Sequence, residues 1–174
     1  MDYDVIIAGG GMVGAALACA LGDSALRVAL VESTPLERIR PTAEMDLRVS
    51  AIGRAAQRLF AAVGAWERLP AERTGPFREM EVWDASGSGR IHFDSTAFGE
   101  PLLGWIIENR VIQYALLEQA QTYSNLDLLC PVQLALASPQ DDGLHLRLED
   151  GRSLRTRLLV GADGAQSQVR HWAG

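Results

Sequence analysis

The pattern of apolar and polar positions predicts that the chain opens with two buried strands joined by a helix. Unbroken apolar runs at residues 5–8 and 28–31 are typical of parallel strands that are covered on both faces. Between them, residues 15–21 are good helix formers, and Gly22 is suited to end the helix. A strand, a helix and a second strand in this order predict a parallel βαβ unit, and hence an α/β fold.

Prolines and charges in residues 35–46 predict a loop, after which helical spacing resumes. We expect Ser50 to cap a helix that ends at Gly64. A second helix is predicted from residue 110 to about 122, with Asn109 as its cap. The residues expected to form the buried stripe of the first of these helices are Leu59, Phe60 and Val63.

Short strands account for the remaining apolar segments. Residues 77–84 and 91–93 flank a Ser/Gly run and predict a hairpin, and residues 102–107 form a further apolar stretch. In residues 144–148, leucines alternate with polar residues, which indicates a half-buried antiparallel strand. The other strands expected in this part of the chain cover residues 126–129, 132–136, 153–156 and 158–161. The pattern therefore predicts a small antiparallel β-meander inserted before a last buried strand.

The first predicted strand leads into a glycine-rich turn with the spacing Gly-x-Gly-x-x-Gly, at Gly9, Gly11 and Gly14. In this context Gly9 permits the tight turn, Gly11 lets the backbone approach a pyrophosphate, and Gly14 lets the helix pack closely on the sheet. The free N–H groups of the helix and the positive end of its dipole then face the phosphates. Glu32 ends the second strand, where the fold places the acid that binds a ribose hydroxyl pair. Together these features predict dinucleotide binding.

Composition and charge narrow the class of protein. The 174 residues are 48% hydrophobic and 22% charged, which is typical of one globular domain, or of one domain with part of another. The net charge of −6 argues against a nucleic-acid surface. No apolar run reaches the roughly 18 residues of a membrane span, and the acidic start is unlike a signal peptide, so we expect a cytoplasmic protein. Neither the two cysteines nor the three histidines show metal-ligand spacing, so no metal site is predicted.

Four short motifs occur at separated positions in the chain. They are Gly-Gly-Gly-Met-Val-Gly at residues 9–14, Leu-Arg-Val-Ser-Ala-Ile at 47–52, Glu-Asn-Arg at 108–110 and Gly-Ala-Asp-Gly-Ala-Gln-Ser at 161–167. In combination they resemble the motifs of the aromatic-ring flavoprotein hydroxylases, which are FAD-dependent monooxygenases. Within that group the sequence is most similar to the bacterial ubiquinone-biosynthesis hydroxylases of 2-octaprenyl phenols and benzoquinols. The resemblance covers essentially all of the chain.

The resemblance implies that the glycine turn binds FAD rather than NAD. The residues that it implies around the pyrophosphate are Gly9, Gly11, Met12, Val13 and Gly14. By the same resemblance Glu32 holds the adenosine ribose, and Val132 offers its backbone to the adenine edge. Arg48 and Arg110 are implied to meet phosphate or ribityl oxygens. Asp163 belongs to a motif that the family associates with FAD and with the passing NAD(P)H.

The implied activity is monooxygenation of an aromatic ring. NAD(P)H reduces the flavin, O2 adds at the flavin C4a carbon, and one oxygen atom passes to a phenol or quinol ring. The implied substrate is a polyprenylated aromatic of ubiquinone biosynthesis, and no catalytic side chain is assigned because the cofactor carries the chemistry. A substrate with a lipid tail leads us to expect peripheral association with the inner membrane or with a ubiquinone-biosynthesis complex. Exposed apolar area would favour a homo-oligomer.

The sequence departs from the family pattern because the third motif, Gly-Asp-Ala-Ala-His, does not occur in these residues. We therefore expect the FAD-binding half of such an enzyme, without its substrate domain and inactive alone. Residues 1–75 are expected to form the dinucleotide-binding βαβ unit and the following helix, residues 76–100 an inserted hairpin, and residues 101–174 the helix, the meander and the Asp-Gly motif. Two other classes stay open, namely an NAD-dependent dehydrogenase domain and a non-catalytic domain that binds a partner protein.

Overall fold

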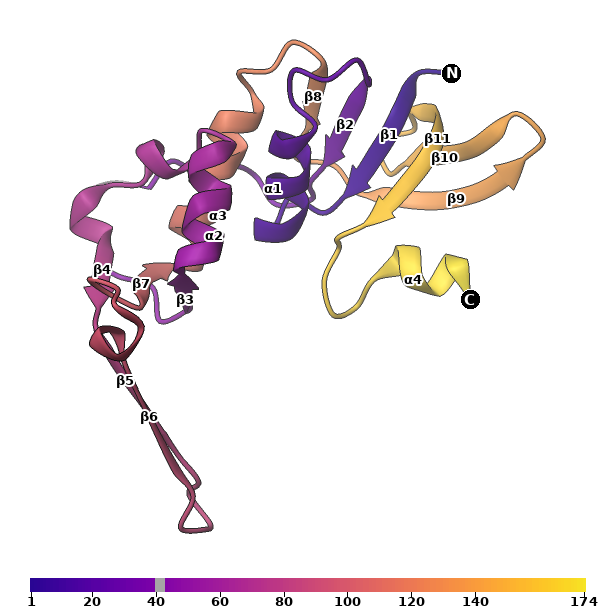
Figure 1. The fold of residues 1–174 in the computed structure, drawn as a ribbon. Coiled ribbons are helices and arrows are strands. Elements are labelled where there is room, and N and C mark those ends of the chain that lie inside the picture. Colours follow the sequence, from indigo (N-terminus) through magenta and orange to yellow (C-terminus); the bar gives the residue numbers. More distant parts are fainter. Residues whose placement is uncertain (40–42) are drawn as a thin grey trace. The chain divides into compact units, whose positions relative to one another are not determined.

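The computed structural model describes residues 1–39 and 43–174, and Figure 1 shows its elements. The chain folds into two compact units. The first unit consists of Met1–Ala43 together with Gln113–Gly174, and the second consists of Glu44–Ile112. Part of the predicted loop at 35–46, residues 40–42, lies outside the described residues.

The first unit is built on a six-stranded sheet with the strand order β8-β2-β1-β11-β10-β9. Its strands are β1 (Tyr3–Ala8), β2 (Val28–Val31), β8 (Leu126–Leu129), β9 (Leu134–Gln140), β10 (Gly143–Leu148) and β11 (Ser153–Gly161). Strands β8, β2, β1 and β11 pair in parallel, while β10 and β9 continue the sheet in antiparallel fashion. The predicted α/β class, with a parallel βαβ unit and an antiparallel meander, is confirmed.

Strand β11 replaces two predicted strands, at 153–156 and 158–161, because it runs unbroken through both. Its first half pairs antiparallel with β10, and Thr156 to Gly161 pair in parallel with β1. Arg157 interrupts the apolar pattern, but the backbone on either side of it stays hydrogen-bonded, so the strand does not end there. Strand β9 likewise extends beyond the predicted 132–136, to Gln140, because it pairs with β10 along its length.

Three helices accompany this sheet. Helices α1 (Met12–Ala20) and α4 (Gln168–Ala173) belong to the first unit, and α3 (Asn109–Ala120) begins in the second unit and ends in the first. Cys19 of α1 is 3% exposed and donates its thiol hydrogen to the carbonyl of Leu116 in α3, with 3.2 Å between sulfur and oxygen. These two helices therefore pack against each other. The apolar cluster that the parallel strands share with the meander contains Ile6, Ala8, Ala29, Val31, Val132, Leu134, Leu146 and Leu148.

The second unit contains a three-stranded antiparallel sheet in the order β3-β7-β4 and a separate two-stranded ribbon, β5-β6. Its strands are β3 (Val49–Gly53), β4 (Thr74–Phe77), β5 (Glu79–Trp83), β6 (Arg90–Asp94) and β7 (Gly104–Glu108). Its helix is α2 (Arg54–Ala62), and short 3₁₀ turns lie at Trp66–Arg68, Ala71–Arg73 and Ser95–Phe98. The ribbon confirms the hairpin that was predicted around the Ser/Gly run.

The predicted start of the helix in this unit is wrong. Ser50 does not cap a helix but lies within strand β3, and its hydroxyl donates to Asn109 Oδ1 at 2.6 Å. Helix α2 begins at Arg54 with Gly53 as its N-cap. Strand β3 pairs with β7, which is distant in the sequence, and a pairing of this kind leaves no signal in local helical spacing. In the predicted stripe Phe60 is 7% exposed, whereas Leu59 is 49% exposed.

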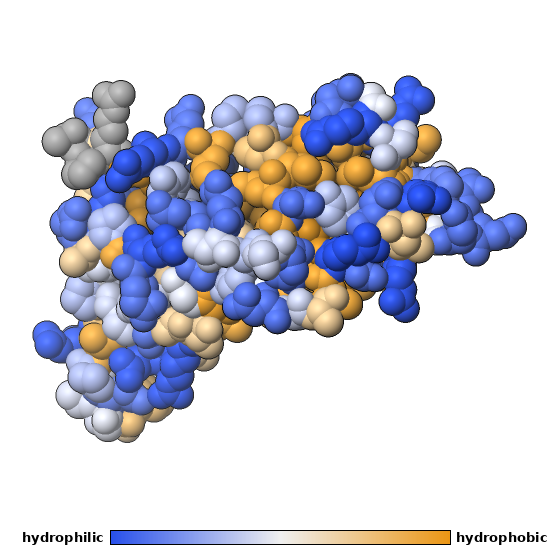
Figure 2. All heavy atoms as spheres, turned by 90° about the horizontal axis from the view of Figure 1, so that it is seen from above, coloured by the Kyte–Doolittle hydropathy of each residue, from blue (hydrophilic) through white to orange (hydrophobic). Residues whose placement is uncertain are grey.

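Apolar side chains also reach the surface, and Figure 2 shows a patch of them that hydrophilic residues surround. In the ribbon, Val82 pairs with Ile91, and these two residues are 50% and 58% exposed. A two-stranded ribbon is marginally stable without further packing, so this exposed pair marks a weakly supported part of the second unit. Among the described helices, none has the length and apolar character that crossing a membrane requires.

Candidate functional site

The glycine turn lies where β1 ends and α1 begins, and its residue Gly9 packs against the backbone that follows β11. Gly9 has φ +100°, a value that L side chains rarely adopt, and its N–H donates to the carbonyl of Val31 at 2.8 Å. A Cβ atom on Gly9 would lie 2.4 Å from the carbonyl oxygen of Ala162 and 2.9 Å from the Cα atom of Asp163. The backbone of the turn therefore touches the backbone of the Asp-Gly motif, as only glycine allows.

The other two glycines of the motif have different surroundings. A Cβ atom on Gly14 would lie 1.9 Å from the carbonyl oxygen of Gly9, so the absence of a side chain lets α1 pack closely on the turn, as predicted. A Cβ atom on Gly11 would meet no described protein atom within 4 Å. Gly11 has φ −63° and ψ 178°, which any residue can adopt. Space rather than backbone strain therefore distinguishes Gly11.

The start of α1 suits an anion in that space. Gly11 is the N-cap of the helix and offers no side chain to its N–H groups, and the first turn contains no acidic residue. Ala15 donates to the Gly11 carbonyl at 2.9 Å, so the N–H groups before Ala15 precede the first bond of the helix. Met12 is half-buried, whereas Val13 is 76% exposed. The turn and the helix start thus fit a pyrophosphate held by backbone donors.

Glu32 directs its carboxylate at the backbone of the same turn. The residue is 7% exposed, and its Oε2 accepts from the N–H of Gly10 at 2.7 Å. Its Oε1 accepts from the N–H of Thr34 at 2.6 Å. The Ser33 hydroxyl also donates to Oε1, at 3.4 Å. An ionised carboxylate has about four acceptor sites, so about one more hydrogen bond, for example from a ribose hydroxyl, can be accommodated. Glu32 therefore has a structural role in the turn, and the ribose contact stays a prediction.

Val132 and Asp163 also lie in the first unit, and both have local partners. The N–H of Val132 donates to the carbonyl of Glu32 at 2.8 Å, so a backbone contact to an adenine would have to use the carbonyl oxygen of Val132. Asp163 Oδ1 accepts from the Ser167 hydroxyl at 2.6 Å, and its Oδ2 accepts from the N–H of Gln168 at 2.7 Å. Burial opposes ionisation of Asp163, but these hydrogen bonds outweigh it and hold the pKa of the carboxyl below its usual range.

The structure groups Arg48 and Arg110 in the second unit. Arg110 contacts Glu108 Oε2 through Nε at 2.9 Å and through Nη2 at 2.8 Å. Glu108 is fully buried, and its Oε1 accepts from Arg73 Nη1 at 2.5 Å. Burial raises the pKa of Glu108, but the hydrogen bonds from the Asp46 N–H and from the two arginines more than offset it, so the pKa is lowered. Arg48 is exposed, and its N–H donates to Asp46 Oδ1 at 3.0 Å.

Two residues that shape the turn, Gly10 within it and Gln113 outside it, were not predicted from the sequence. Gly10 is buried, and a Cβ atom on it would lie 2.9 Å from both Cβ and Oε2 of Glu32. Gln113 of α3 donates from Nε2 to the carbonyl of Gly10 at 3.0 Å. Gly10 occupies a variable position of the glycine motif, and Gln113 is 103 positions away from it, so neither carries a local sequence signal.

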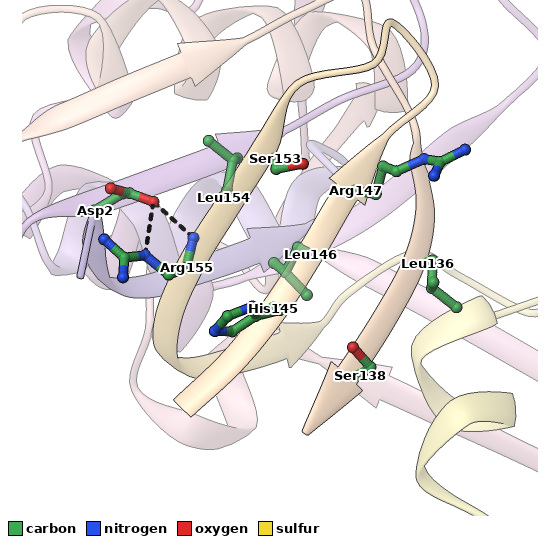
Figure 3. Close-up of a pocket in the computed structure, with 9 residues that line it drawn as sticks. All are labelled: Asp2, Leu136, Ser138, His145, Leu146, Arg147, Ser153, Leu154 and Arg155. Atoms are coloured by element: carbon green, nitrogen blue, oxygen red, sulfur yellow. Dashed lines mark hydrogen bonds and ion pairs between the residues drawn. The ribbon is translucent and has the colours of Figure 1, made fainter. Parts of the chain in front are cut away.

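A hollow of about 440 Å³ lies elsewhere in the first unit, on strands β9, β10 and β11 (Figure 3). Figure 3 shows Asp2 beside Arg155, whose backbone N–H donates to Asp2 Oδ2 at 2.8 Å and whose Nε lies 3.9 Å from the same oxygen. No residue predicted for the dinucleotide site lines this hollow. Within residues 1–39 and 43–174, no group of three or more His, Cys, Asp or Glu side chains is placed to hold a metal ion.

The chain matches a protein-family model along almost its entire length. Residues 2–174 fit the family described as FAD binding domain. The chain belongs to this family. All the residues of the glycine turn, together with Glu32 and Asp163, lie inside the matched range. Of the two dinucleotides that the glycine motif accommodates, this family takes FAD, as predicted.

Two similar proteins are ubiquinone-biosynthesis enzymes. The 3-demethoxyubiquinol 3-hydroxylase of Escherichia coli (strain K12) is 36% identical over 171 residues, which cover 98% of this chain and 44% of that protein. The ubiquinone biosynthesis monooxygenase COQ6, mitochondrial, of Homo sapiens is 36% identical over 189 residues, which cover 99% of this chain and 39% of that protein. The chain thus spans less than half the length of these relatives.

Solved structures of other bacterial proteins share the fold. A variant of PqsL from P. aeruginosa matches with a TM-score of 0.76 and 26% sequence identity, over 97% of this chain and 45% of that one. The p-nitrophenol 4-monooxygenase PnpA from Pseudomonas putida DLL-E4 matches with a TM-score of 0.78 at 19% identity, over 99% of this chain and 44% of that one. At that identity PnpA supports the fold alone.

Proposed function

We propose that the chain is the FAD-binding part of an NAD(P)H-dependent aromatic-ring hydroxylase that acts on a polyprenylated phenol or benzoquinol in ubiquinone biosynthesis. The observation that carries the FAD assignment is the match of residues 2–174 to the FAD-binding family, and the open space at Gly11, beside backbone donors at the start of α1, gives the pyrophosphate its place. The substrate class is supported by 36% identity with two ubiquinone-biosynthesis enzymes over nearly the whole chain. Because the chain spans less than half of those proteins, we propose the aromatic pocket and the complete reaction only for a longer protein with the full length of these relatives.

The glycine turn would hold the pyrophosphate of the cofactor. The N–H groups at Gly11, Met12 and Val13 would donate to phosphate oxygens, because the positive end of the helix dipole and free backbone donors coincide there. Glu32 would accept a ribose hydroxyl at the acceptor site that Gly10, Ser33 and Thr34 leave free. This contact is a charge-assisted hydrogen bond, which is stronger than a neutral one.

We assign the remaining contacts by the resemblance of the motifs. Arg48 and Arg110 would meet phosphate or ribityl oxygens, and Glu108 would hold the Arg110 guanidinium in position for this. Val132 would contact the adenine edge through its carbonyl. The ordered carboxylate of Asp163 would fix the backbone that packs on Gly9.

Bound FAD would supply the redox chemistry, taking electrons from NAD(P)H and allowing one oxygen atom of O2 to be transferred to the aromatic ring. The described residues would supply binding and orientation, and we assign no acid–base role to any of them. A polyprenylated substrate resides in the lipid phase, and we therefore infer that the longer protein works at the periphery of the inner membrane. Association with other ubiquinone-biosynthesis enzymes and self-association through exposed apolar surface are consistent with this proposal.

The test is a titration of the purified chain with FAD, followed by quenching of flavin fluorescence. Gly11→Val fills the open space beside the helix start and should abolish FAD binding while the fold is kept. Gly53→Val is the matched control, because Gly53 is also an N-cap glycine in extended backbone with no described protein atom within 4 Å of its Cβ position. It should bind FAD as the wild type does.

The outcomes separate the classes of function. Undiminished FAD binding in Gly11→Val would refute the assigned loop. Binding of NADH without any flavin would favour a dehydrogenase domain. Binding of neither ligand by the wild type would favour a non-catalytic domain that binds a partner protein.

A further inference from the structure

The peptide group on each side of Gly10 is held by a different side chain. The N–H of Gly10 donates to Glu32 Oε2 at 2.7 Å, and its carbonyl accepts from Gln113 Nε2 at 3.0 Å. Glu32 follows strand β2 and Gln113 lies in helix α3. Both side chains that hold the turn therefore come from outside it. The motif residues themselves contribute neither of these side chains.

The hydrogen bond from Gln113 sets the direction of the next N–H group. A trans peptide group is planar, and its C=O and N–H bonds point in opposite directions. When the Gly10 carbonyl points to Gln113, the N–H of Gly11 must point away from Gln113. Gly11 is also the residue whose Cβ position is open.

The peptide between Gly10 and Gly11 needs such a restraint. Both of its residues are glycines, which populate positive and negative φ about equally, so this peptide can rotate with little steric resistance. A rotated peptide would present the carbonyl oxygen of Gly10 to the anion site in place of the N–H of Gly11. An oxygen facing a phosphate is repulsive, and a donor facing it is attractive.

We infer that Gln113 is a positioning residue for the pyrophosphate, which holds the Gly10–Gly11 peptide with its N–H directed to the phosphate. The inference rests on the proposed function of the turn. Gln113 does not touch the phosphate itself. Its effect is specific to ligands that carry phosphates, because only they use the N–H of Gly11.

Competition titrations with ADP and adenosine against FAD test this role. Gln113→Leu removes the donor, and Gln113→Asn keeps an amide that is too short to reach Gly10. Gln121→Leu is the matched control, because Gln121 also donates to a backbone carbonyl, that of Leu117, at 3.1 Å within the same region of the chain. Circular dichroism of each variant checks the fold, and the Asn variant carries the test if the Leu variant does not fold.

In both Gln113 variants the dissociation constants of FAD and ADP should rise about five- to tenfold, the effect of losing one hydrogen bond. The dissociation constant of adenosine should stay within about twofold, and Gln121→Leu should change none of the three. Unchanged ADP binding, or equal weakening of ADP and adenosine, would overturn the positioning role alone. Failure of the wild type to bind FAD or ADP would overturn the proposed function as well.

Discussion

Replacing Gly14 by alanine should destabilise the chain, although the same change within a helix usually stabilises it. Alanine in place of glycine gains about 0.5–1 kcal/mol in a helix interior. At Gly14, however, the new Cβ would lie 1.9 Å from the Gly9 carbonyl oxygen and 3.1 Å from the Ala162 side chain. Gly9 cannot retreat, because its own Cβ position lies against the backbone of Ala162 and its N–H is bonded to Val31.

The clash should outweigh the gain in helix propensity. Overpacking of this kind costs about 1–3 kcal/mol, so we expect a net loss of roughly 1–2 kcal/mol in the free energy of unfolding. In urea unfolding followed by circular dichroism, this loss should appear as a lower midpoint concentration of urea, while the dependence of the unfolding free energy on urea concentration stays unchanged. Gly11→Ser is the control, because its Cβ position is open and serine is a favourable N-cap, so its stability should change by less than about 0.5 kcal/mol. A midpoint for Gly14→Ala at or above that of the wild type would refute the reasoning.

Two further predictions concern buried carboxylates. Glu32→Ala should weaken FAD binding by about 1–3 kcal/mol, the scale of a charge-assisted hydrogen bond, and unchanged affinity in a titration would remove Glu32 from the site. The lowered pKa of Glu108 means that its ion pairs with Arg73 and Arg110 stabilise the fold at neutral pH, and that this contribution disappears as the pH falls through the depressed pKa. The difference in unfolding free energy between wild type and Glu108→Gln should therefore be large at pH 7 and shrink in acid, and a difference independent of pH would contradict the assignment.

Strands that form unbroken apolar runs could be located from the sequence alone. Val28–Val31 has the predicted bounds, because this run lies between Arg27 and Glu32. Leu126–Leu129 also has the predicted bounds, although Asp127 interrupts its leucines. Strand β3 could not be found in this way, since residues 49–53 acquire their conformation from pairing with β7. The continuity of β11 through Arg157 likewise depends on the backbone pairing with β1 rather than on the side-chain pattern.

In the candidate site too, features set by a local motif could be predicted from the sequence, whereas contacts between distant residues could not. The spacing of the glycines predicted the close approach of α1 at Gly14 and the tight turn at Gly9, because these are properties of the motif itself. The hydrogen bond from Gln113 to the Gly10 carbonyl links residues 103 positions apart, and no motif predicts it. The sequence predicts that Glu32 binds the sugar, and the structure adds that its carboxylate accepts hydrogen bonds from the N–H groups of Gly10 and Thr34.

The contact of Gly9 with Ala162 has a consequence for how the protein acquires its cofactor. The turn is encoded at residues 9–14, but one of its walls is encoded near residue 162. On the ribosome the N-terminal strand and helix emerge long before that wall exists. We therefore expect FAD to bind only after β11 has been translated and has paired with β1. A peptide that ends after β2 should not bind FAD.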